Sequence, residues 1–510
     1  MKCKKLIAIL LVIAMLPALS LTGFAKASDG EKRFKTKAYA FRYNSGDKAD
    51  WKSTMYYTDD YFSLDATKAP NPSMATATYA ICLAAMGSYV SVHNEDWAKS
   101  DKNLKAIYKK LGFKHYYSNE GFKVEPSTDS IGVGFASKKY KDSTVIAVGI
   151  RGAGYMGEWG GNVNVGKTGE HSGITIAANT VIDELKQYIA DNNIKGNIKI
   201  WMTGYSRGAG VTNLAAARID EGALKGTKVK LQKKDMFAYC FEPLAAGLES
   251  NDLTNPRYDN IWCFINPNDI VPKLVMKEFG FGQYGKKYYY PNIRETENYN
   301  ARKNKMVKYY NRIPSKEVPG EYCVDDFRMY KLTDKGIVKE KNTAVTQGEF
   351  LSDLLSVLST EFLGSRDVFV NEYQNGFRIA LYGILGHRIL TGNETNVEAF
   401  NEALKANLLE EDMETRLAKA KANPYSLNYG FETVITDLVT ESLNEAGINS
   451  FDPCSNAKFV ANVVKLLVGL IISHPDYAIT LIMNLSNIAD AHYPETSYAW
   501  LQSMDSNYKL

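Results

Sequence analysis

The middle of the chain alternates short apolar runs with helical stretches. Runs typical of strands are "STVIAVGIRG", "NIKIWMTG", "DMFAYCFEP" and "NIWCFINP", and helical periodicity appears between them in "SGITIAANTVIDELKQYIADN" and "RGAGVTNLAAARID". Strands buried on both faces read as continuous apolar runs, and the helices between them form the crossovers of a parallel sheet. The runs "DSIGVGFASKKY" and "STVIAVGIRG" flank a polar turn at 138–142, which predicts two paired strands. Residues 124–300 are therefore predicted to form an α/β core.

The first 27 residues have the pattern of a secretory signal peptide. A basic start is followed by an apolar run of about fifteen residues and by Ala25-Lys26-Ala27, which resembles a cleavage site. Cys3 precedes the apolar run, so a lipid anchor is not expected. We expect the mature chain to begin near Ser28 and to be secreted.

Charge and cysteine content exclude several classes of protein. The 61 basic residues of the whole chain, without the four lysines of the signal segment, equal its 57 acidic residues. This balance argues against nucleic-acid binding and against a purely electrostatic membrane patch. The five remaining cysteines are widely spaced and form no C-x-x-C pair, so neither a disulfide scaffold nor a zinc site is indicated. Cys240 and Cys263 lie in apolar runs and are predicted to be small buried hydrophobic residues.

Three further segments surround the core. Residues 28–123 are aromatic and helical and are expected to pack on it, and residues 301–485 form a mainly helical insertion. Its most apolar stretch is interrupted at 474–476, which predicts two packed helices rather than a membrane span. Residues 486–510 return the chain to the core.

Ser206 lies in "WMTGYSRGAG", a Gly-x-Ser-x-Gly pattern. The pentapeptide alone is weak, but here a strand precedes it and a helix follows it, which is the setting of a nucleophile elbow. The turn is so sharp that side chains at 204 and 208 would collide with the adjoining strand and helix, and both residues are glycine. A serine hydroxyl is a poor nucleophile, so a base and an orienting acid are still required.

Several segments resemble the class 3 lipase family in the family's own order. The nucleophile segment "IKIWMTGYSRGAGVTNLAAARI" is accompanied by "STVIAVGIRGAGYMGEWGGNVNVG", "GEHSGITIAANTVIDEL", "FAYCFEPLAAG" and "INPNDIVPKL". These are similar to the family's R-G-[ST] oxyanion segment, its H-x-G-F helix start, its F-G-x-P-x-x-G strand end and its D-x-V-P segment. The resemblance implies an α/β-hydrolase fold and a Ser-Asp-His triad.

Asp269 in "NPNDIVP" matches the acid of the family. A carboxylate just beyond a sheet strand can orient a histidine, although Asn-Pro-Asn-Asp is also turn-forming in any protein. If the order Ser, Asp, His holds, the base is His387, His474 or His492. His492 in "ADAHYPETSYAWL" is favoured, because it is predicted to lie in a polar loop and resembles the family's late H-x-x-x-x-Y segment.

Backbone N–H groups are needed to bind the developing oxyanion. One is expected from Arg207 and the other, by resemblance, from Ala153, where the family usually has serine or threonine; Gly154 is the alternative. The Arg207 side chain has three possible roles: pairing with an acid of the insertion, contact with an anionic substrate group, or a structural ion pair. His171 precedes the serine and is predicted to be structural.

The sequence thus predicts a secreted serine hydrolase that cleaves carboxylic esters, with lipid or small ester substrates and no cofactor or metal. Lipase, phospholipase and esterase activities are not separated. The helical insertion is either a cap or lid over the site or a scaffold. The alternatives are a non-catalytic binding protein on a hydrolase scaffold, and a thioesterase or peptidase with the same triad.

Overall fold

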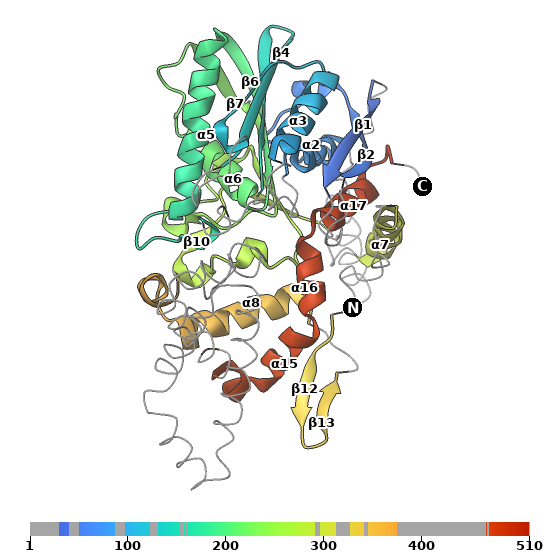
Figure 1. Cartoon of the computed structure of the whole chain (residues 1–510), viewed down its shortest axis with the longest axis vertical. Helices are drawn as coiled ribbons and strands as arrows, with labels where there is room; N and C mark the ends of the chain where they lie inside the picture. The colour runs from blue at the N-terminus through green and yellow to red at the C-terminus, as the bar shows by residue number, and fades with distance from the viewer. Residues whose placement is uncertain are drawn as a thin grey trace, which may run out of the picture.

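A computed structural model gives the fold of the chain (Figure 1). It describes residues 30–39, 50–86, 97–122, 131–152, 158, 161–290, 296–312, 327–340, 345–374, 466 and 469–508. The expected signal peptide at 1–27 and much of the expected helical insertion lie outside the described residues.

A seven-stranded sheet forms the centre of the molecule, in the order β11-β9-β7-β6-β5-β4-β3. Its strands are β3 (Lys114–Ser118), β4 (Val133–Tyr140), β5 (Ser143–Ile150), β6 (Gly196–Tyr205), β7 (Val229–Phe241), β9 (Ile261–Ile265) and β11 (Lys286–Tyr289). The strands from β5 to β11 are parallel, and β4 and β3 are added antiparallel at one edge. This mostly parallel sheet confirms the predicted α/β-hydrolase fold class. The edge strand β3 begins before the predicted core boundary at residue 124.

The predicted pairing of the two strands around 138–142 is confirmed. β4 and β5 pair as far as Tyr140 and Ser143, which leaves only Lys141 and Asp142 for the turn. Lys141 adopts a φ of 52°, as two-residue hairpin turns require. The turn is shorter than the predicted one because β4 continues through the polar residues.

Helices cover both faces of the sheet (Figure 1). α5 (Ser172–Asp191) and α6 (Arg207–Asp220) pack on one face, and α2 (Pro72–Ala85) and α3 (Trp97–Lys110) on the other. Side chains alternate along a strand, so Ile200 and Met202 of β6 join the core beneath α5 and α6, whereas Trp201 faces α2. The Trp201 indole N–H donates to the Thr78 hydroxyl of α2 at 2.8 Å. Burial on both faces explains why β6 reads as one apolar run.

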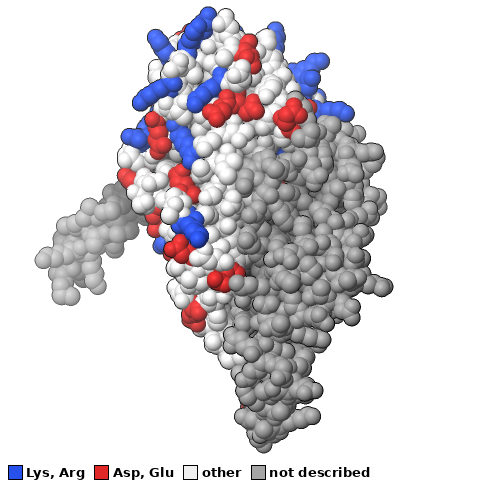
Figure 2. Space-filling model, turned by 60° about the vertical axis from the view of Figure 1, so that its left-hand side comes forward, with Lys and Arg blue, Asp and Glu red and all other residues white. Residues whose placement is uncertain are grey.

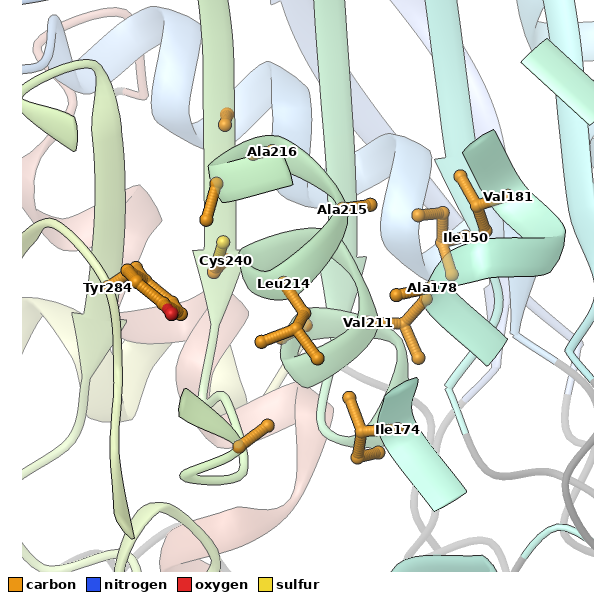
Figure 3. Close-up of a cluster of buried hydrophobic side chains, with 14 of the residues drawn as sticks. Ile150, Ile174, Ala178, Val181, Val211, Leu214, Ala215, Ala216, Cys240 and Tyr284 are labelled. Carbon is orange, nitrogen blue, oxygen red and sulfur yellow. The ribbon is translucent and has the colours of Figure 1, made fainter. Parts of the chain in front are cut away.

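The core beneath α6 is built from small and branched side chains. Figure 3 shows Val211, Leu214 and Ala215 of α6 against Ala178 of α5 and Cys240 of β7. Cys82, Cys240 and Cys263 are buried free thiols, which confirms the prediction for the last two.

The C-terminal helix α17 (Pro494–Met504) packs against α2 and against α7 (Thr296–Tyr310). The Tyr498 hydroxyl donates to the Thr54 carbonyl at 2.8 Å, and the Ser73 hydroxyl donates to Asp505 at 2.9 Å. These bonds hold the end of the chain to the N-terminal segment, which also contains the hairpin of β1 (Lys32–Tyr39) and β2 (Asp50–Tyr57). The residues just before α17 are thereby fixed beside the sheet.

A smaller group of elements lies beyond one end of the sheet (Figure 1). It contains β12 (Tyr330–Thr333), β13 (Gly336–Lys339), α8 (Gln347–Val357), the short α9 (Arg366–Val368), α15 (Pro475–Met483) and α16 (Leu485–His492). Phe350, Leu354 and Ile488 belong to its own apolar cluster. The hairpin of β12 and β13 is an addition to the predicted mainly helical segment 301–485. Within the described residues, no helix has the length and apolarity to span a membrane.

Charged side chains of both signs are interspersed over the described surface in Figure 2, with lysines and arginines gathered at its upper end. The upper end is opposite the elements α8, α15 and α16.

Candidate active site

Ser206 lies between the end of β6 and the start of α6, so the predicted strand, turn and helix are observed. Its backbone has φ 56° and ψ −123°, a conformation that costs on the order of 1–3 kcal/mol for a residue with a side chain. Two features hold it. The Ser206 N–H donates to the Phe241 carbonyl at 2.9 Å, and the Ser206 carbonyl accepts from Ala209 and Gly210 at 2.9 and 3.1 Å.

The two glycines of the motif are required by close approaches of the backbone. A Cβ at Gly204 would lie 2.2 Å from the Gly208 carbonyl oxygen, and a Cβ at Gly208 would lie 2.6 Å from the Arg151 carbonyl oxygen. The elbow therefore brings β6, α6 and the end of β5 together more closely than any side chain allows.

The structure brings Ser206, Asp269 and His492 into one hydrogen-bonded row. His492 Nε2 lies 3.0 Å from Ser206 Oγ, and His492 Nδ1 lies 2.7 Å from Asp269 Oδ2. Asp269 is fully buried, while the side chains of Ser206 and His492 retain slight exposure. In this arrangement the serine hydroxyl donates to Nε2, and the Nδ1–H donates to the carboxylate.

Asp269 is positioned by the turn that follows β9. Its N–H donates to the Asn266 carbonyl at 3.0 Å, and its Oδ1 accepts from the Val271 N–H at 2.8 Å. The Lys273 ammonium donates to the carbonyls of Pro267 and Asp269, each at 2.8 Å. The turn that carries Asp269 lies at the same edge of the sheet as Ser206, because the parallel strands β6 and β9 end there. β7 lies between these two strands.

His492 is the last residue of α16, so the prediction that it lies in a polar loop is wrong. The helix ends there because Pro494 begins α17. The carbonyls at the end of α16 accept from donors at the ends of the sheet strands: Asn266 Nδ2 donates to the Ala491 carbonyl at 3.0 Å, and the hydroxyl of Tyr205, the last residue of β6, donates to the His492 carbonyl. The structure thus fixes the histidine through its backbone as well as its ring.

Tyr205, the residue before Ser206, contacts His492 and was not predicted from the sequence. Its ring stacks on the His492 imidazole, with centroids 5.0 Å apart and planes 20° apart. Burial raises the pKa of the Tyr205 hydroxyl well above its usual value, so it remains a donor at ordinary pH. The sequence feature that could have identified Tyr205 is its position inside the Gly-x-Ser-x-Gly motif, next to Ser206.

The other histidines lie elsewhere or outside the described residues. His474 caps α15, and its Nε2 lies 2.7 Å from Glu361 Oε2. His387 falls outside the described residues. His171 is fully buried at the start of α5, where its Nδ1 accepts from the Ile174 N–H at 3.4 Å. This is the structural position predicted for it.

His171 is expected to make the protein sensitive to acid. Burial, and secondarily the charge of Arg207, lower the pKa of His171 from 6.5 to about 4. Below about pH 6.5 the unfolded chain therefore binds a proton at His171, whereas the folded protein binds it only near pH 4. The free energy of unfolding thus falls as the pH drops from about 6.5 to about 4, by about 3 kcal/mol in all.

Urea unfolding at about pH 7 and about pH 4.5 measures this loss. His171→Asn keeps an oxygen acceptor for the Ile174 N–H but has no titrating group, and it should show a smaller fall in unfolding free energy between the two pH values. Equal falls in both proteins would contradict the assignment.

Arg207 is the first residue of α6, where the N–H groups of a helix face outward and its dipole favours negative charge. The Arg207 side chain is fully buried; it donates to Asn162 Oδ1 at 3.2 Å and to the Gly173 carbonyl at 3.4 Å. These contacts make its guanidinium part of the core near α5. Ala153 and Gly154 lie outside the described residues.

Comparison with known proteins gives one family match. Residues 142–279 match the family described as lipase, class 3. This segment contains Ser206 and Asp269, while His492 lies outside it. A comparison with curated protein sequences gave no significant match.

Among solved structures, a native lipase propeptide complex of Rhizomucor miehei is 18% identical with a TM-score of 0.25, and the match covers 36% of this chain and 57% of that one. A triacylglycerol lipase, described as having a serine protease triad as its catalytic centre, is 18% identical with a TM-score of 0.32, covering 44% and 83%. A mutant of MDLA from Penicillium cyclopium is 20% identical with a TM-score of 0.27, covering 43% and 77%. The chain thus spans little more than half of the first of these structures.

Proposed function

We propose that this chain is a serine hydrolase that cleaves carboxylic esters of lipids through an acyl-enzyme, and the match of residues 142–279 to the class 3 lipase family supports this proposal. The observation that carries the proposal is the hydrogen-bonded row of Ser206, His492 and Asp269, with distances of 3.0 and 2.7 Å. These are the separations that proton transfer between a hydroxyl, an imidazole and a carboxylate requires.

The reaction has two halves. Ser206 Oγ attacks the ester carbonyl carbon while its proton passes to His492 Nε2, and Asp269 stabilises the imidazolium that forms. His492 then gives the proton to the leaving alcohol as the C–O bond breaks, which leaves the acyl group on Ser206. A water molecule attacks this ester with His492 again as base, and the acid is released.

The oxyanion of each tetrahedral intermediate needs donors in place before it forms. We assign one to the N–H of Arg207 at the start of α6, because a helix N-terminus favours negative charge. The second is assigned to Ala153, with Gly154 as the alternative.

The elements beyond the sheet edge are proposed to act as a cap that also carries the histidine. The side chain of Gln347, the first residue of α8, donates to the Asn268 carbonyl beside Asp269 at 2.9 Å, and the Gly348 N–H donates to Asn268 Oδ1 at 3.2 Å. α16 ends on His492. These contacts hold the cap against the turn that carries Asp269. We propose that the acyl chain of the substrate lies against the apolar helices of the cap.

A fluorophosphonate label that reacts with activated serines tests the proposal. The mature protein recovered from the culture medium should be labelled, Ser206→Ala should not, and His474→Ala, which leaves the row intact, should be labelled like the wild type. p-Nitrophenyl esters of short, medium and long acyl chains, together with matched thioester and anilide substrates, then define the specificity. Absence of labelling and of hydrolysis in the wild type would favour a non-catalytic binding protein, and preference for thioesters or anilides would favour a thioesterase or peptidase.

A further inference from the structure

A second buried carboxyl group lies beside Asp269. Glu242 directly follows β7, and Asp269 follows β9, the neighbouring strand of the sheet. Both residues are fully buried, and their side chains are in hydrogen-bonding contact with one another. The proposed reaction makes no use of Glu242.

Glu242 joins the elements that carry the acid and the base. The Asn266 N–H, in the turn of Asp269, donates to Oε1 and Oε2 of Glu242 at 3.1 and 2.9 Å. Oε1 also accepts from the Tyr290 hydroxyl at 2.6 Å and from the Ser497 hydroxyl at 3.2 Å. Ser497 belongs to α17, the helix that begins just after His492. Oε1 thus accepts from three donors, whereas Oε2 accepts from the Asn266 N–H.

The backbone at Glu242 favours glycine rather than a long side chain. Its φ is 53°, in the left-handed region that glycine adopts without strain. A carboxyl is therefore present here against the local conformational preference, held by the hydrogen bonds around it.

The charge balance favours a neutral Glu242. Burial, and next the charge of Asp269, raise the pKa of Glu242 well above its usual value, against the opposing hydrogen bonds from Tyr290 and Asn266. Lys273 is the cation that faces the pair from the turn after β9. The other titratable groups around the pair are Tyr79, Tyr205, Tyr290, Glu495 and His492, and burial raises the pKa of the three tyrosines so that they stay neutral.

We propose that Glu242 is a positioning residue: as a neutral carboxylic acid it donates its proton in a hydrogen bond to the Asp269 carboxylate. This bond fixes the carboxylate that receives the His492 Nδ1–H and stabilises part of its negative charge. It thereby reduces the negative charge that Asp269 presents to the imidazolium formed in the reaction. The inference rests on the proposed function, because it assigns Glu242 to the same row of groups.

Two variants at this position test the inference through the pH dependence of kcat/KM on a p-nitrophenyl ester. Glu242→Gln keeps the shape, a donor and an acceptor, so its kcat/KM should stay within about threefold of wild type, with the acid limb unmoved. Glu242→Gly relieves the backbone strain but removes the donor, so kcat should fall roughly 10- to 100-fold. Its acid limb should move to higher pH, because an Asp269 carboxylate without this donor stabilises the imidazolium more strongly.

A merely structural role would leave the acid limb of Glu242→Gly in place, and that result would overturn the inference. A shift of the acid limb of Glu242→Gln to lower pH would also overturn it, because loss of a negative charge would show that Glu242 is ionised in the wild type. If the wild type neither hydrolyses esters nor takes up the fluorophosphonate, the proposed function itself fails.

Infrared spectroscopy gives a readout that does not depend on activity. Near pH 9, where Asp220, whose pKa burial raises to about 7, is ionised, the wild type should show the carbonyl stretch of a protonated carboxylic acid. The difference spectrum between the wild type and Glu242→Gln should isolate this band, and Glu242→Gln should retain the wild-type unfolding temperature. Ser206→Ala should retain the band. Absence of the band from the wild type would overturn the inference. This test does not require Glu242→Gly, so it remains decisive if that variant does not fold.

Discussion

Alanine in place of Ser206 or of His492 should lower kcat for an ester substrate by roughly 10⁴- to 10⁶-fold. Ser206→Ala removes the atom that attacks, and His492→Ala removes the group that accepts its proton at 3.0 Å. The two groups act as one unit, so the double variant should be scarcely slower than either single variant. Steady-state kinetics with a p-nitrophenyl ester, at enzyme concentrations high enough to detect residual turnover, measures the effect.

His474→Ala is the matched control for His492→Ala. Within the part of the chain that the structure describes, its ring pairs with Glu361 at 2.7 Å and packs edge-on against Tyr477 rather than against Ser206. Its kcat should therefore remain close to the wild-type value. An active His492→Ala together with an inactive His474→Ala would remove His492 from the mechanism, whatever the fold.

Gly204→Ala should abolish the nucleophile elbow and destabilise the protein by about 3 kcal/mol or more. The added Cβ would lie 2.2 Å from the oxygen and 2.3 Å from the carbon of the Gly208 carbonyl, and 2.7 Å from the Thr212 hydroxyl. Two of these atoms are backbone, so relief requires that α6 shift away from β6. The shift would move Ser206 away from His492, and activity should fall with stability. Urea unfolding and ester hydrolysis on the same preparation measure both effects.

Gly210→Ala provides a control within the same helix. A Cβ there would meet Leu244 at 3.3 Å or more, and alanine favours a helix interior over glycine by about 1 kcal/mol. Stability and activity should stay near the wild-type values. If Gly204→Ala were equally tolerated, the close approach at the elbow would not be a requirement of the fold.

Much of the α/β core could be predicted because its determinants are local. Strands buried on both faces are apolar along their buried length, and β6 and β9 follow the predicted runs closely. β7 begins six residues before its predicted run, at Val229 rather than residue 235, because its first half is polar and only partly buried. The hairpins β1–β2 and β12–β13 were not predicted. Their strands are polar and partly exposed, with Lys331 and Lys339 in the second hairpin, so they lack the apolar signal of the core strands.

The placement of the base depended on distant parts of the chain. His492 was favoured by elimination and resemblance, but its position at the end of α16 results from Tyr205 and Asn266, which bond the last carbonyls of that helix. No local pattern around His492 encodes these partners. The same holds for Glu242, whose neighbours Tyr290 and Ser497 come from β11's end and from α17.

The sequence by itself determined the strand, turn and helix around Ser206 and the turn of Asp269, because glycine spacing and apolar runs act within a few residues. Only the tertiary structure decided which histidine lies 3.0 Å from Ser206 and that Glu242 lies against Asp269. The reason is physical: these contacts form where the ends of parallel strands meet two C-terminal helices, so each depends on packing between segments separated by much of the chain.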